Sequence, residues 1–148
     1  MRVYLDNCCF NRPYDDQSRF KVSMETRAKL HIQDLIRHGR LELVDSFMLA
    51  YENDANPDRM RRDAIASFRE QFRKYYVPFE WKETLLPAVE AIMETGVKYK
   101  DAMHVACAEY AGCDYLLTTD LRLLKYRTGK VRIINPLEFT QMEEEEEF

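Results

Sequence analysis

The sequence predicts an α/β protein in which a central, mainly parallel sheet of four to five strands is covered by helices. Two observations lead to this class. Short apolar runs of strand length alternate along the chain with longer segments in which apolar residues recur at helical spacing. Strands joined through helices pair in parallel, and a parallel sheet is buried on both faces. At 148 residues the chain is long enough for one such domain with its own core.

Four elements are predicted in the first half of the chain. Val3–Leu5 is a short apolar strand, and residues 7–18 after it read as a loop. Over residues 28–36 the apolar side chains recur at i, i+4, i+7 and i+8, which predicts an amphipathic helix. Leu41–Val44 is the second strand, and the continuous apolar run over 47–51 predicts a buried helix directly after it.

The second half continues the same alternation. Its helical segments repeat apolar residues at i, i+3 and i+4 or i+7, and its strands are rich in β-branched or aromatic residues. In chain order, these elements are a helix over 65–72, a strand candidate at 75–77, helices over 89–93 and 102–110, a strand at 115–117, a short helix over 121–124 and a strand at 131–134.

Residues 1–140 are expected to form a single domain, and residues 141–148 an acidic, disordered tail. A run of glutamates is typical of a solvated chain end. The formal net charge is −4, but Glu143–Glu147 contributes five negative charges, so the rest of the chain carries +1. The global charge therefore does not exclude a nucleic-acid partner.

The protein is expected to be cytoplasmic, with no membrane partner. The apolar run Phe47–Tyr51 is far too short to span a bilayer, and the first residues have no signal-peptide core. The four cysteines show no C-x-x-C spacing and the three histidines no H-x-x-x-H spacing, which argues against a zinc site. Small reduced thiols are typical of the cytoplasm.

Acidic residues stand where predicted strands end. Asp6 follows the first strand directly, and Asp120 follows the strand at 115–117 after two threonines. In an open parallel sheet, ligands bind outside the carboxyl ends of the strands, so these side chains converge if their strands are neighbours. Asp120 can equally be the N-cap of the short helix after it.

Two more carboxylates complete the set. Glu52 lies six residues beyond Ser46, about 9 Å along the predicted helix, so its long side chain can reach back toward the strand ends or lie at the solvated helix end. Asp101 opens a helix, where a carboxylate favours the dipole, and small residues after it let that helix pack close to the sheet. We call four residues the acidic quartet: Asp6, Glu52, Asp101 and Asp120.

The quartet and its flanking residues resemble the PIN-domain ribonuclease family. The matching segments are "VYLDN", "LAYEND", "KDAMHVACA" and "LLTTD", and "IINPLEF" resembles the last strand and exit of that family. The resemblance covers about residues 1–140 and implies a three-layer α/β/α sandwich. It implies a metal-dependent endoribonuclease acting on RNA, most similar to the toxin of a type II toxin–antitoxin pair, with a small antitoxin partner and a homodimeric state. The alternatives are an RNA-processing PIN nuclease and a non-catalytic RNA-binding or scaffold domain.

Four ionised carboxylates in one crevice need a counter-charge. Two unit charges 4 Å apart repel by roughly 4 kcal/mol at an effective dielectric constant of 20. Oxygen ligands without a cysteine and histidine set favour Mg²⁺ or Mn²⁺. The quartet is therefore the expected catalytic and metal-binding set, with Asp6 and Asp101 as the inner ligands.

Further residues have both a functional and a structural interpretation. Thr118 and Thr119 can donate hydrogen bonds to the carboxylates or to a phosphate, or fill a strand. Asn7 can do likewise or belong to an ordinary turn. Arg12 can bind an RNA phosphate or form a surface salt bridge. The basic stretch over 58–76, which carries aromatic residues, is either a strand-tracking surface or a charged helix packed on the core.

Overall fold

The computed structural model describes residues 1–146 and contains a five-stranded, all-parallel sheet. The strands, in chain order, are β1 (Arg2–Leu5), β2 (Glu42–Ser46), β3 (Arg73–Val77), β4 (Tyr115–Leu117) and β5 (Arg132–Ile134). Their spatial order is β3-β2-β1-β4-β5. The predicted α/β class with a parallel sheet is confirmed, and the strand candidate at 75–77 is the edge strand β3.

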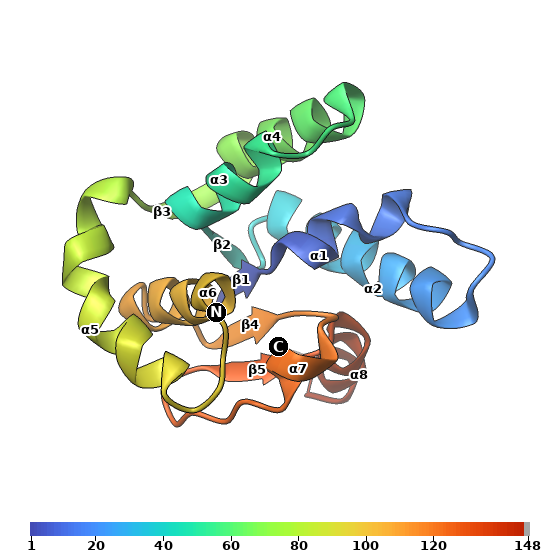
Figure 1. Ribbon diagram of the computed structural model, residues 1–148. Helices are drawn as coiled ribbons and strands as arrows, with labels where there is room; N and C mark the ends of the chain where they lie inside the picture. The colour runs from blue at the N-terminus through green and yellow to red at the C-terminus, as the bar shows by residue number, and fades with distance from the viewer. Residues whose placement is uncertain (147–148) are drawn as a thin grey trace.

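Helices connect the strands and cover the sheet (Figure 1). They are α1 (Asn7–Asn11), α2 (Phe20–Arg37), α3 (Phe47–Asp54), α4 (Arg59–Phe72), α5 (Lys82–Met93), α6 (Tyr99–Tyr110), α7 (Leu121–Leu124) and α8 (Pro136–Glu146), with 3₁₀ turns η1 (Arg12–Tyr14) and η2 (Phe79–Trp81). Helix α2 packs against α8, and α5 packs against α6. Figure 1 shows these two pairs on opposite sides of the sheet. None of the helices within residues 1–146 is long and apolar enough to cross a membrane.

The core lies between these layers because the central strands are apolar on both faces. Val3, Tyr4 and Leu5 of β1 are fully buried, and so are Leu116 and Leu117 of β4. A strand with no exposed face belongs in the middle of a covered parallel sheet. This is the place that β1 and β4 occupy.

The segment after β1 differs from the predicted loop over residues 7–18. Helix α1 begins directly at Asn7, and η1 follows it. The reason is local: the Asp6 carboxylate accepts a hydrogen bond from the Asn7 backbone N–H and so caps the helix. The buried Cys9 and Phe10 then anchor α1 on the core.

The acidic end also differs from the expected disordered tail, because α8 continues to Glu146 and includes residues 141–146. Phe139 of this helix is fully buried, and its ring contacts Tyr115 edge-on at 5.2 Å between centroids. Glu143 pairs with His31 of α2 at 3.2 Å. Docking of the first turns against the sheet and α2 thus extends the helix into the glutamates, whose helix propensity is high. Residues 147 and 148 lie outside the described part of the chain.

The strand order creates a switch point between β1 and β4. The connection after β1 leads to β2 on one side, while the connection after β4 leads to β5 on the other side. Connections that leave in opposite directions open a crevice at the carboxyl ends of the two strands. A functional site is therefore expected at the residues that follow β1 and β4.

Candidate functional site

Asp6 lies at this switch point and is oriented by groups from both strands. Its Oδ1 accepts the Asn7 backbone N–H at 2.8 Å, and its Oδ2 accepts the Thr118 hydroxyl at 2.8 Å. The Asp6 backbone N–H donates to the Leu117 carbonyl at 2.9 Å, which ties the end of β1 to β4. The Cys8 thiol donates to Oδ2 at 3.4 Å. The Asp6 side chain is buried and its direction is well defined.

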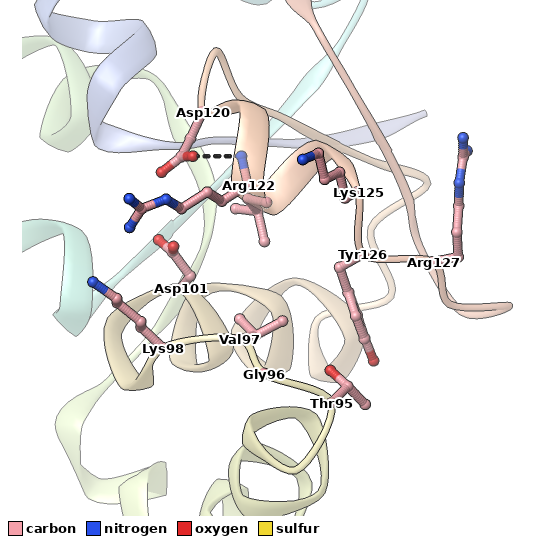
Figure 2. Close-up of a pocket in the computed structure, with 11 residues that line it drawn as sticks. Thr95, Gly96, Val97, Lys98, Asp101, Asp120, Arg122, Lys125, Tyr126 and Arg127 are labelled. Carbon is pink, nitrogen blue, oxygen red and sulfur yellow. Dashed lines mark hydrogen bonds between the residues drawn. The ribbon is translucent and has the colours of Figure 1, made fainter.

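Asp120 approaches the same edge from the end of β4. Its carboxylate accepts the Arg122 backbone N–H at 2.8 Å and N-caps α7, and its own N–H donates to Thr118 Oγ1 at 3.1 Å. The capping interpretation of Asp120 is therefore correct, and the cap does not remove the residue from the edge. Figure 2 shows the carboxylates of Asp120 and Asp101 at the same end of a cleft of about 690 Å³.

The pKa of Asp101 depends on the charges of the neighbouring carboxylates. The residue is half-buried in the first turn of α6, and within residues 1–146 it has no hydrogen-bond or ion-pair partner. Burial, followed by the negative charges of Asp6 and Asp120 and then of Glu52, raises the pKa of Asp101 to about 6, against the opposing charge of His104. Asp101 and Asp120 line the same cleft, and Thr118 contacts both Asp120 and Asp6, so these carboxylates lie at one edge of the sheet.

Glu52 reaches back from α3 to the strand ends and meets His104. Its Oε1 is hydrogen-bonded to His104 Nε2, and this nitrogen lies 3.7 Å from Asp6 Oδ1. One ligand atom each from Asp6, Glu52 and His104 lies within 4.8 Å of the other two. Two carboxylate oxygens and an imidazole nitrogen at this spacing can hold one divalent cation.

His104 is the residue of the site that sequence reasoning missed. Its side chain is fully buried, with Nδ1 2.5 Å from the Tyr4 hydroxyl, which in turn lies 2.6 Å from Ser46 Oγ. Burial lowers the pKa of His104, but the hydrogen bond to Glu52 and the charges of Asp6 and Glu52 outweigh it, so the pKa is raised. Both ring nitrogens are thus engaged, Nε2 with Glu52 and Nδ1 with Tyr4.

A signal for His104 was present in the sequence. His104 follows Asp101 by three residues, and residues at i and i+3 share one face of a helix. His104 belongs to no H-x-x-x-H pattern. A histidine that joins ligands from other segments needs no such pattern, because its partners come from β1 and α3 and not from its own helix.

The predicted supporting residues have different surroundings. The Thr118 hydroxyl contacts Asp6, whereas Thr119 contributes its backbone N–H to the Cys8 sulfur at 3.4 Å. The Asn7 side chain accepts from Asn11 Nδ2 at 3.3 Å within α1, so only its backbone supports Asp6. Of these residues, Thr118 alone directs a side chain to a quartet carboxylate.

Arg12 is engaged inside the protein. Its Nε donates to the buried Glu25 at 2.9 Å, and its Nη1 donates to Asp15 at 3.0 Å. The second carboxylate oxygen of Glu25 accepts from Asn135. This network ties η1 to α2 and to the start of α8, so the geometry favours the salt-bridge interpretation of Arg12 over phosphate binding.

The basic stretch over 58–76 forms α4 and β3. Ile65 and Phe68 of α4 are buried in the core, and Arg69 is buried against Asp45 at 3.0 Å. These contacts favour the second interpretation of the stretch, a charged helix packed on the core.

The fold is shared with solved structures of low sequence identity. VapBC2 from Rickettsia felis, bound to a DNA fragment from their promoter, matches with a TM-score of 0.56 and 10% identity over 91% of this chain and 98% of that chain. FitAcB from Neisseria gonorrhoeae matches with a TM-score of 0.57 and 15% identity over 90% and 97%. No protein-family model and no curated protein sequence matches the chain. The likeness supports the PIN-like α/β/α fold predicted from the sequence.

Proposed function

We propose that this protein is a metal-dependent endoribonuclease of the PIN type. One observation carries the proposal: four carboxylates from segments far apart in the sequence converge at the switch point of a parallel sheet. There burial, together with the negative charges of Asp6, Asp120 and Glu52, raises the pKa of Asp101. A fold rarely places four like charges together without a counter-ion, because their repulsion opposes folding. The quartet is therefore the proposed catalytic and metal-binding set.

The donor atoms fit a hard divalent cation. Carboxylate oxygens are the preferred ligands of Mg²⁺ and Mn²⁺, and Mn²⁺ also accepts an imidazole nitrogen. Asp6 and Asp101 are the proposed inner ligands, since Asp6 is held rigidly by Thr118 and Asp101 lacks any partner in the described residues. Glu52, from α3, and Asp120, from the end of β4, are proposed to complete the site.

A bound Mg²⁺ or Mn²⁺ would supply Lewis-acid chemistry, activating water and offsetting the negative charge of a reacting phosphodiester. The residues of the chain supply position and charge. Thr118 holds the Asp6 carboxylate by a hydrogen bond, and the Arg122 backbone N–H of α7 holds the Asp120 carboxylate. His104 holds Glu52 in place from the buried side. These groups are set by the fold before any substrate arrives.

The biological setting is proposed from the sequence resemblance. The nearest functional class is the toxin of a type II toxin–antitoxin pair, which implies an RNA substrate, a small antitoxin and a homodimer. The four cysteines are free thiols in the structure, which accords with the expected cytoplasmic location.

The direct test is an RNase assay on a labelled RNA that contains both single-stranded and hairpin segments. We expect internal cleavage with Mg²⁺ or Mn²⁺, loss of cleavage after EDTA treatment, and recovery when either ion is added back. Asp6→Asn serves as the inactive control against contaminating nucleases. Equal cleavage with and without EDTA would reject the metal-dependent reaction, while RNA binding without any cleavage would favour the scaffold alternative.

A further inference from the structure

The cleft beside Asp101 and Asp120 has a strongly basic lining that the proposed reaction does not use. Its walls are the segment from Thr95 to Lys98 on one side and α7 with the residues after it on the other. In Figure 2 the two carboxylates lie at one end, with Tyr126 and Arg127 toward the other. We call this space the basic cleft, after four cationic lining residues: Lys98, Arg122, Lys125 and Arg127.

These four cations are available to an external ligand. All four side chains are exposed, and within residues 1–146 none of them forms an ion pair. Lys130, farther along the same loop, is different because it faces Glu109 at 4.0 Å. Four unpaired positive charges around one concave space repel one another, and an anionic ligand would relieve that repulsion.

The shape of the charge distribution restricts the ligand. Positive groups extend along the cleft, while the acidic pair occupies one end, so the ligand must carry negative charge along its length. Tyr126, a half-buried aromatic residue that stands between Lys125 and Arg127 in the sequence, also lines the cleft. Backbone-tracking cations together with an aromatic ring are the usual surface for single-stranded nucleic acid, because every base has a face that can stack.

We infer that the basic cleft binds the single-stranded RNA segment next to the scissile phosphate, with the phosphates on Arg122, Lys125 and Arg127 and a base against Tyr126. The inference rests on the proposed function, which places a phosphodiester at Asp101 and Asp120. A strand that leaves this point enters the cleft directly, since the two carboxylates are part of its lining.

The test separates binding from cleavage. Binding of a fluorescein-labelled eight-nucleotide oligouridine RNA is measured by anisotropy on the full chain carrying Asp101→Asn, in EDTA, so that neither metal nor turnover contributes. The variant pair Lys125→Gln and Arg127→Gln is introduced into this background. The matched control pair is Lys21→Gln and Arg27→Gln, two exposed cations of α2 that also have no ion pair within residues 1–146.

We expect the cleft pair to weaken binding at least about tenfold at low salt, and the control pair to leave it within twofold. The plot of log K against log salt has a negative slope, and this slope should become shallower by about 1.4 in the cleft pair. Each phosphate contact on a single strand contributes roughly 0.7 to its magnitude. Tyr126→Leu should weaken binding about tenfold, and Tyr126→Phe should retain it. Melting temperatures verify that each variant is folded.

Three results would overturn the inference. Equal losses in the cleft and control pairs would mean general charge attraction. A stronger affinity for hexaglutamate peptide than for the RNA would mean that the cleft takes an acidic protein segment. In a separate assay the cleft pair is placed in the chain that keeps Asp101, with metal present. Wild-type cleavage of RNA with an unchanged KM by that variant would place the strand elsewhere while leaving the nuclease proposal intact. Conversely, cleft-dependent RNA binding without any cleavage would reject the nuclease and retain the inference.

Discussion

At the scale of single residues, Asp101 decides between a structural and a catalytic interpretation of the acidic edge. We predict that Asp101→Asn keeps or slightly raises the stability of the metal-free protein, because one repelling charge is removed from beside Asp6 and Asp120. Cleavage should fall at least ~100-fold, the scale of losing one strong transition-state stabiliser. Thermal melts and single-turnover cleavage measure the two effects. Near wild-type cleavage would remove Asp101, and with it the quartet, from the mechanism.

The raised pKa of Asp101 predicts a pH dependence of the metal-free protein. A carboxyl whose folded pKa of about 6 lies above its ordinary value of 3.8 stabilises the fold in its protonated form. That contribution is complete below about pH 4 and is lost as the pH rises through about 6. Melting temperatures in EDTA should therefore fall across this window relative to Asp101→Asn, whose amide does not titrate. Parallel curves for the two proteins would show that the pKa of Asp101 is not raised in the folded protein. The charged groups that act on the Asp101 carboxyl are the same in the wild type and in Asp101→Asn: Asp6, Glu52, Asp120 and His104.

His104 is predicted to position Glu52 from the buried side. His104→Leu should lower Mn²⁺ affinity about 10- to 100-fold, the usual effect of losing a group that orients a ligand. Tyr4→Phe, which removes the hydroxyl that contacts both Nδ1 and Ser46 Oγ, should cause a smaller loss in the same direction. Titration calorimetry reads metal affinity without reference to catalysis. The control is His31→Gln, an exposed histidine of α2, and unchanged Mn²⁺ affinity in His104→Leu would make His104 a core residue only.

At the scale of elements, a buried ion pair joins β2 to α4. Asp45 is fully buried at the end of β2 and accepts from Arg69 at 3.0 Å and from Arg73 of β3 at 3.1 Å. We predict that Arg69→Met costs about 3 kcal/mol of unfolding free energy, because Arg73, which is partly exposed, is then the cation that remains to pair with the buried carboxylate. Urea denaturation measures the change. Arg59→Met in the same helix, where the side chain is 86% exposed, should cost less than about 0.5 kcal/mol. Equal costs would mean that the pair adds nothing beyond packing.

At the scale of the whole molecule, the sequence resemblance predicts a homodimer formed through helices outside the acidic edge. Light scattering at high micromolar concentration should then report twice the chain mass of 17.7 kDa. Dilution should shift the mass toward the monomer if the interface is modest in area. A mass of 17.7 kDa at all concentrations would contradict the prediction.

The order of elements and the position of three quartet members followed from local patterns. Short apolar runs reflect strands that are buried in a covered sheet, and apolar repeats at helical spacing reflect burial on one face of a helix. Both patterns reveal elements without knowledge of contacts. Asp6 and Asp120 could be placed at strand ends because the strands themselves were recognisable, and Asp101 at a helix start for the same reason. The placement of Glu52 near the strand ends depended on its distance along the helix and on the length of its side chain.

What the sequence by itself determined about this protein is therefore the α/β class, the parallel sheet and the acidic residues at its carboxyl edge. Only the tertiary structure decided the partners: that Arg12 pairs with Glu25, that α8 extends to Glu146, and that His104 contacts Glu52. The physical reason is the separation along the chain over which each kind of interaction acts. Hydrophobic periodicity and helix capping act between residues close in sequence, whereas His104 and Glu52 lie 52 positions apart and meet because β1, α3 and α6 pack at one edge of the sheet.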